Sequence, residues 1–228
     1  MRKIIALAAV ALIALGYVVY LNLDDAVKTV IEKAGSEALG TKVRVGKLDV
    51  SLANKMASLS NLSIANMPGF KTDDILKTNS ISVTIDDVAN NTVTLKEVTI
   101  SGLTVNYELN QNGANFDALQ NNIKSSSSSG SSGKTSGIYV AIETLKITHA
   151  QVIPNIGGVR SPVSLPDITI TNIGTKSAPA TPRQVAAQIM KKVLATSSTA
   201  LLKNGPPLKL PGLSADKATN ALKSLLPK

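Results

Sequence analysis

Apolar and polar residues alternate through most of the middle of the chain. Ile81, Val83 and Ile85, for example, are separated by Ser82 and Thr84. Successive side chains of a β-strand point to opposite faces, so this pattern predicts strands with one face toward a core and one toward water. We expect about eight such strands in one antiparallel sheet. The other alternating segments contain Val43, Val45, Leu48, Val50 and Leu52; Leu59, Leu62 and Ile64; Val93, Leu95, Val98 and Ile100; Leu103, Val105, Tyr107 and Leu109; Val140, Ile142, Leu145 and Ile147; and Ile168 and Ile170.

The alternation slips by one residue at a recurring place. In Val93, Leu95, Val98 and Ile100, two residues instead of one separate the middle pair, and at least two further segments repeat this spacing. One extra residue in a strand is typical of a β-bulge, which bends the strand and increases its twist. The sheet is therefore expected to be curved.

Helical periodicity flanks the alternating segments. Residues 26–38 place apolar side chains on one face and precede Gly40, which is a helix stop signal. Residues 183–202 do the same, and Thr181, Pro182 and Gln184 form the expected start of that helix. A short helix is expected after Asn115, and another from residue 214. The fold class is thus α+β, a curved antiparallel sheet with packing helices at the start and at the C-terminus.

The first 23 residues predict a membrane anchor. Residues 4–23 carry no charge, and twenty helical residues span about 30 Å, the thickness of the hydrocarbon core of a bilayer. Arg2 and Lys3 favour a cytoplasmic N-terminus with the body on the far side. The alternative is a signal peptide cleaved after the small-x-small sequence that ends at Gly16. Both interpretations export the body.

Charge divides the remainder into two parts, residues 24–175 and 176–228. The 228-residue chain has a net charge of +9, and residues 176–228 contain nine basic residues against Asp216 alone. A localised basic segment indicates an anionic partner. Scarce aromatic residues and the export signal argue against nucleic acid, so an anionic membrane surface is favoured, with simple solubilisation of an apolar tail as the alternative. The candidate residues for this surface are Arg183, Lys191, Lys192, Lys209, Lys217 and Lys223.

Residues suited to catalysis are scarce. The chain has no cysteine and a single histidine, His149, so no cofactor or metal site is expected. Residues 128–135 approach a phosphate-binding loop, but they lie in the Ser/Gly-rich stretch 125–136, which predicts a flexible loop and not the strand that such a motif requires. The adjacent carboxylates at 24–25, 73–74 and 86–87 are interpreted as turn or helix-start residues. The chain is therefore predicted not to be an enzyme.

The order of segments resembles a known family. Leu39-Gly40 is followed by Val43-Arg44-Val45, by the stretch LSNLSIANMPGF at residues 59–70, and by ISGLTVNYE at residues 100–108. Together with the N-terminal anchor, these resemble the AsmA-like family of bacterial envelope proteins over about residues 1–123. Met67 separates the Asn and Pro that are contiguous in that family. The resemblance implies a single-pass protein of the bacterial inner membrane, with a periplasmic body whose curved sheet encloses an apolar groove; large relatives are implicated in phospholipid movement and outer-membrane homeostasis.

Two hypotheses for function follow. In the first, the apolar face of the sheet is a groove that binds phospholipid or acyl chains; the alternative is that the helices at 26–38 and 183–202 cover this face as a dry core. In the second, the protein is a scaffold that docks an envelope protein or an anionic membrane through its basic C-terminal helices. The candidate groove residues are Ile81, Val83, Ile85, Val98, Ile100, Val105, Ile142 and Ile147.

Overall fold

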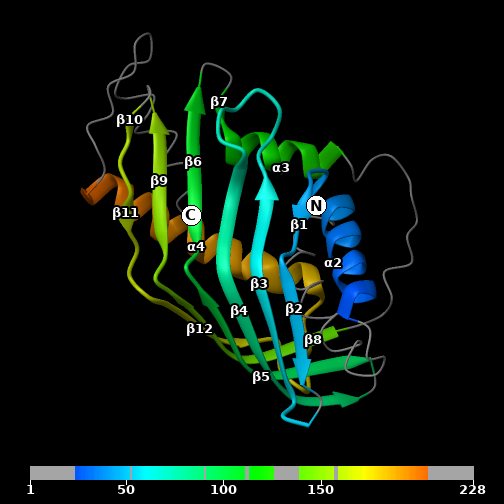
Figure 1. Ribbon diagram of the computed structural model, residues 1–228. Helices are drawn as coiled ribbons and strands as arrows, with labels where there is room; N and C mark the ends of the chain where they lie inside the picture. The colour runs from blue at the N-terminus through cyan, green and yellow to red at the C-terminus, as the bar shows by residue number, and fades with distance from the viewer. Residues whose placement is uncertain are drawn as a thin grey trace.

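The computed structural model describes residues 24–51, 53–89, 91–110, 113–125, 139–156 and 159–204. The predicted anchor, most of the Ser/Gly-rich stretch and the tail from residue 205 lie outside these ranges. The described residues form one open mixed sheet of twelve strands with three helices (Figure 1). The helices are α2 (Asp24–Leu39), α3 (Asn115–Ser125) and α4 (Pro182–Asn204). The strands are β1 (Val43–Arg44), β2 (Lys47–Ser51), β3 (Met56–Ala65), β4 (Asp74–Ala89), β5 (Thr92–Ser101), β6 (Thr104–Asn110), β7 (Gly113–Ala114), β8 (Tyr139–Thr148), β9 (Gln151–Ile156), β10 (Val159–Arg160), β11 (Val163–Ser164) and β12 (Ile168–Ile173).

The predicted class, α+β with a helix packed on a large sheet, is confirmed. The prediction of a wholly antiparallel sheet is wrong, because β5 pairs with β8 and β6 pairs with β9 in parallel. A parallel pair needs a long crossover. Between β5 and β8 the chain forms β6, β7 and α3, and β8 begins beside the start of β5, where Tyr139 pairs with Thr92.

The two faces of the sheet follow the predicted alternation. One row of side chains, each opposite the next in register, is entirely aliphatic and buried, whereas the neighbouring row is polar. This arrangement is that of a sheet with one face in the core and one in water. The buried row is Leu48, Leu59, Ile81, Ile100, Ile147 and Ile168; the polar row is Asp49, Ser58, Ser82, Thr99, Lys146 and Thr169.

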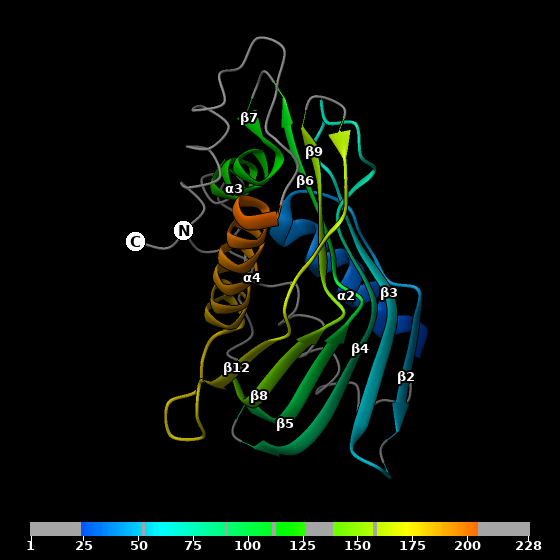
Figure 2. The ribbon, with the colours of Figure 1, turned by 90° about the vertical axis from the view of Figure 1, so that its left-hand side faces the viewer.

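Irregular residues bend the sheet along one line. Strands β5 and β6 are consecutive in the chain, and both pair with β4. Gly102, which has a φ of +68°, lies at the junction between them. The β8–β9 junction is His149, with φ +53°, and β3 contains Asn61, with φ +55°. Below this line β5, β8 and β12 turn away from the direction of β6 and β9, which makes one face concave (Figure 2).

The bulge expected from the slipped alternation is also present. Ile85 and Thr84 of β4 pair with Leu95 and Glu97 of β5, so Lys96 is the extra residue. The predicted bulge is therefore present in β5, and a bulge of this kind adds to the local twist of the strand.

Candidate functional site

The concave apolar face is the candidate site that the sequence predicts. All eight candidate groove residues are buried there, and none is more than 6% exposed. They belong to one continuous cluster that includes residues of all three helices. In the described residues this face is a covered core, so anything that binds to it must enter beneath a helix.

Two of the three helices are hydrogen-bonded to the sheet. In α2, which packs beside β1 and β2, Glu32 Oε1 accepts a hydrogen bond from Val45 N at 2.7 Å and Ser36 Oγ accepts one from Val43 N at 2.9 Å. In α3, Asn115 Nδ2 donates to the main-chain oxygen of Asn106 at 2.8 Å. These bonds join helix side chains to the backbone of β1, of β6 and of the connection between β1 and β2, and they fix both helices in place.

The attachment of α4 is different. Its buried stripe packs against β8, β9, β11 and β12 on the concave side (Figure 2). Among its described side chains, the hydrogen bonds found are local to the helix: the capping pair of Thr181 and Gln184, as the sequence predicts, and bonds from Ser198 and Thr199 to carbonyls four residues back. Apolar packing alone holds the described part of this helix to the sheet.

Two buried hydroxyls have no hydrogen-bond partner among the described residues, Tyr107 Oη on β6 and Ser197 Oγ on α4. The Tyr107 ring stacks on Phe116 of α3 with the ring centroids 6.4 Å apart. Burial raises the pKa of the Tyr107 hydroxyl far above its ordinary value, and the charge of Asp117 adds to the rise. This group therefore stays protonated and available as a donor.

Sequence reasoning missed a buried polar cluster on the other face of β6. The Glu108 carboxylate accepts hydrogen bonds from Lys71 N at 2.7 Å, and from Thr72 N and Oγ1, both at 3.0 Å. Asn115 Oδ1 accepts a bond from Glu108 N at 3.0 Å. Alternation predicts that Glu108 faces solvent, but residues 66–73 cover it; this segment overlaps the end of the stretch 59–70 that carries the family resemblance.

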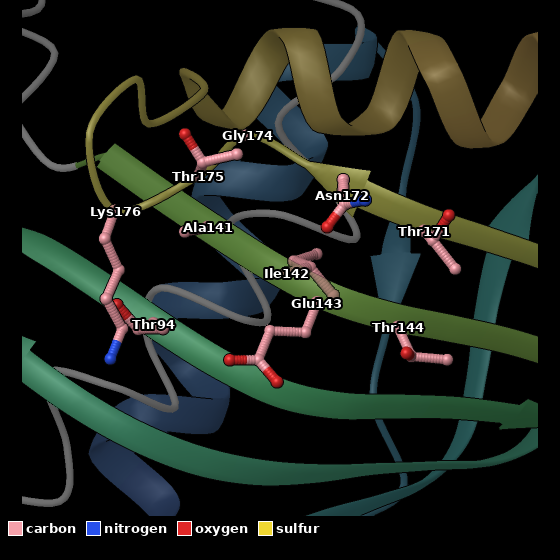
Figure 3. Close-up of a pocket in the computed structure, with 10 residues that line it drawn as sticks. All are labelled: Thr94, Ala141, Ile142, Glu143, Thr144, Thr171, Asn172, Gly174, Thr175 and Lys176. Atoms are coloured by element: carbon pink, nitrogen blue, oxygen red, sulfur yellow. The ribbon is translucent and has the colours of Figure 1, made fainter.

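An open depression lies on the polar face, where the segment after β12 meets β8 and β5. Its volume is about 560 Å³, and Lys176 and Glu143 project from it toward β5 (Figure 3). Lys176 Nζ is 2.7 Å from Asp86 Oδ2, and this hydrogen bond is the main cause that lowers the pKa of Asp86 and raises that of Lys176. The depression is lined by Thr94, Ala141, Ile142, Glu143, Thr144, Thr171, Asn172, Gly174, Thr175 and Lys176. Its hydroxyls and charges could hold a small polar group.

The remaining sequence candidates lie apart from one another. Lys191 and Lys192 are exposed on α4, and Arg183 belongs to the first turn of the same helix. Lys209, Lys217 and Lys223 lie outside the described residues, as do the anchor, the helix expected from residue 214 and the phosphate-loop-like stretch. His149 is exposed at the junction of β8 and β9.

The carboxylate pairs and potential metal ligands offer no alternative site. Asp74 forms ion pairs with Arg44 at 3.1 Å and with Lys77 at 2.9 Å, so its carboxylate is already paired with basic side chains. No group of three or more potential metal ligands occurs within the described ranges. None of the helices described there is long and apolar enough to cross a membrane.

Comparison with known proteins gives no identification. No protein-family model matches the chain, and no curated protein or solved structure matches it. The resemblance to the AsmA-like family therefore stays a prediction.

Proposed function

We propose that the chain is a non-enzymatic, membrane-anchored protein of the AsmA-like type, with its body in the periplasm, that holds an acyl chain of a phospholipid between the concave face and α4. The observation that carries this proposal is the aliphatic row from Leu48 to Ile168, which crosses six strands without a polar interruption. A long aliphatic surface is complementary to a hydrocarbon chain, as it is to the apolar stripe of a helix. The unpaired hydroxyls of Tyr107 and Ser197 supply the polar groups available to an ester or carboxylate.

Photo-crosslinking tests this function. The full-length protein in detergent micelles would be incubated with a diazirine-labelled palmitate, irradiated and analysed by peptide mass spectrometry. Crosslinks are expected on the inward-facing residues of β8, β9 and β12 and on α4. Crosslinks confined to the polar face, for example at Thr99 and Lys146, would overturn the proposal, as would a folded protein that takes up no label.

A second function, docking on an anionic membrane, has separate support. Helix α4 contains four basic residues and no acidic one, and Lys191, Lys192 and Lys203 are exposed. Because most of its apolar stripe packs inward, the exposed side of the helix is mainly polar and basic, so the attraction would be chiefly electrostatic and sensitive to salt.

Vesicle binding tests the docking function. The double variant Lys191→Gln/Lys192→Gln should bind phosphatidylglycerol vesicles more weakly than the parent protein. Adding 0.5 M NaCl should remove the difference, because it shortens the electrostatic screening length to about 4 Å. Lys33→Gln/Lys42→Gln removes the same charge from exposed sites in α2 and just after it, and should bind like the parent. Equal losses in the two double variants would contradict a specific role for α4.

A further inference from the structure

The three helices are attached to the sheet in unequal ways. Helix α2 is hydrogen-bonded through Glu32 and Ser36, and α3 through Asn115. The described side chains of α4 make no such bond to the sheet. We infer that α4 is a hinged cover of the acyl-chain site, fixed at its N-terminal end and able to open at its C-terminal half. This inference rests on the proposed acyl-chain function for the identity of the ligand but not for the motion itself.

The fixed end is the backbone just before α4. Val140 N donates to Ala180 O and Ala180 N donates to Val140 O, both at 2.8 Å, so β8 holds this segment with a reciprocal pair. Gly174 lies against the same pair with φ +69°, and a Cβ atom there would be only 2.5 Å from Ala180 N. The first turn of the helix is then capped by Thr181 and Gln184. These contacts leave the start of α4 little freedom.

The N-terminal half of α4 also packs firmly. Among the side chains described in this half, the buried ones are branched aliphatic residues, and Val185 and Val193 are no more than 3% exposed. Ile189 belongs to the same stripe, which continues past the middle of the helix with Leu194. Large aliphatic side chains bury the most apolar surface per residue and contribute most to holding a helix against a sheet.

The C-terminal half buries small or polar residues between two leucines, Leu194 and Leu201. Ser197, Ser198 and Ala200 lie in its buried stripe, followed by Leu201. Ser197 Oγ has no partner there, and a buried hydroxyl without a hydrogen bond favours any state in which water can reach it. This half faces β9 and the two-residue strand β11, and its end projects past them (Figures 1 and 2). Opening at this end would uncover the concave face while the Val140–Ala180 bridge stays intact.

Thiol labelling tests the motion directly, because the chain contains no cysteine. Single variants Ala200→Cys in α4, Val185→Cys near the hinge and Ala57→Cys in β3 place a reporter at sites that are 7%, 0% and 3% exposed. The full-length variants in identical micelles would react with a thiol reagent under native conditions, in which buried thiols react only when the structure opens locally.

We expect Ala200→Cys to react about tenfold faster than the other two, which should react at similar slow rates. Adding Ser197→Ala to the Ala200→Cys variant should slow its reaction several-fold, because the closed state no longer buries an unpaired hydroxyl. Ser198→Ala is the matched control, since that hydroxyl bonds to Leu194 O within the helix in either state. Equal rates at positions 200 and 185 would overturn the inference, and so would a Ser198→Ala effect equal to that of Ser197→Ala.

Palmitate separates this inference from the proposed function. If both hold, palmitate changes the labelling rate at position 200 and leaves position 57 unchanged. Fast labelling that does not respond to palmitate supports the cover and counts against the acyl-chain site. Slow labelling in a protein that still crosslinks to palmitate supports the site and overturns the cover.

Discussion

Thr72 donates two hydrogen bonds to one oxygen of Glu108, from its backbone N and from its Oγ1, both at 3.0 Å. The two residues are far apart in sequence, and together they hold residues 66–73 over the outer side of β6. Asn66 Nδ2 donates to the same Thr72 hydroxyl at 2.7 Å, which orients the hydroxyl hydrogen toward the carboxylate. Glu108 therefore acts as a structural clamp, and its burial is explained by the three donors that face it.

Replacing this carboxylate should destabilise the fold. We expect Glu108→Gln to lower the free energy of unfolding by about 2 kcal/mol, because the amide nitrogen would face backbone donors and leave them without an acceptor. Urea denaturation measures the change. Glu97→Gln, which removes an exposed ion pair with Lys146, is the control and should cost less than about 1 kcal/mol. Similar losses in both variants would show that Glu108 is not a clamp.

The bend of the sheet should depend on Gly102. Its φ of +68° and the closeness of the Asn79 side chain, 2.3 Å from where a Cβ atom would lie, exclude any larger residue without displacement. Gly102→Ala is expected to cost about 2–3 kcal/mol of folding stability, measured by thermal or urea unfolding. Gly69→Ala is a suitable control: its φ is +91° but no atom lies within 4 Å of the added Cβ, so it should cost only about 1 kcal/mol. If Gly69→Ala lost as much folding stability as Gly102→Ala, the contact with Asn79 would contribute nothing and the positive φ alone would explain both losses.

Removing the unpaired hydroxyl of Ser197 should stabilise the protein. Ser197→Ala is expected to raise the free energy of unfolding by about 1 kcal/mol, because the closed state no longer buries an unsatisfied group. Ser198→Ala, which deletes a hydroxyl that has a partner, should be neutral or slightly destabilising. Chemical denaturation of both variants decides the matter, and a loss of stability in Ser197→Ala would mean that this hydroxyl has a favourable contact.

The Asp86–Lys176 pair should give a measurable pH effect. The hydrogen bond from Lys176 keeps the pKa of Asp86 below its ordinary value of 3.8, so the pair contributes to stability above that pH and the contribution disappears as pH falls through the lowered pKa. Carboxyl-carbon NMR should show Asp86 titrating below 3.8, and Lys176→Met should move the titration upward. An unchanged titration in that variant would contradict the assigned cause.

The sequence contained enough information for the faces of the sheet and for its bulges. The alternation around Ile81, Val83 and Ile85 predicted the buried side, and the slip between Leu95 and Val98 predicted the bulge at Lys96. Both are local properties of the chain, because the direction of a side chain along a strand is set by its neighbours in sequence.

The missed features depend on contacts between distant segments. Nothing near Glu108 in the sequence shows that residues 66–73 will cover it. The parallel pairing of β5 and β8 depends on the path through α3, and the short strands β9–β11, with Pro154 among them, have no clear alternation. For the candidate site, the sequence predicted the buried aliphatic residues and the basic helix, but the unequal attachment of the helices could be seen only in three dimensions.

The bend through Asn61, Gly102 and His149 restricts how this protein can change over evolutionary time. Deleting the irregular residue from β3, from the β5–β6 junction or from the β8–β9 junction alone would shift the following residues of that segment by one position and expose its aliphatic side chains to solvent. Neighbouring strands would then no longer bend at the same position along the sheet. The bend can therefore be gained, lost or moved only by coordinated changes in several strands. The strand ends away from the bend, by contrast, can lengthen or shorten one at a time.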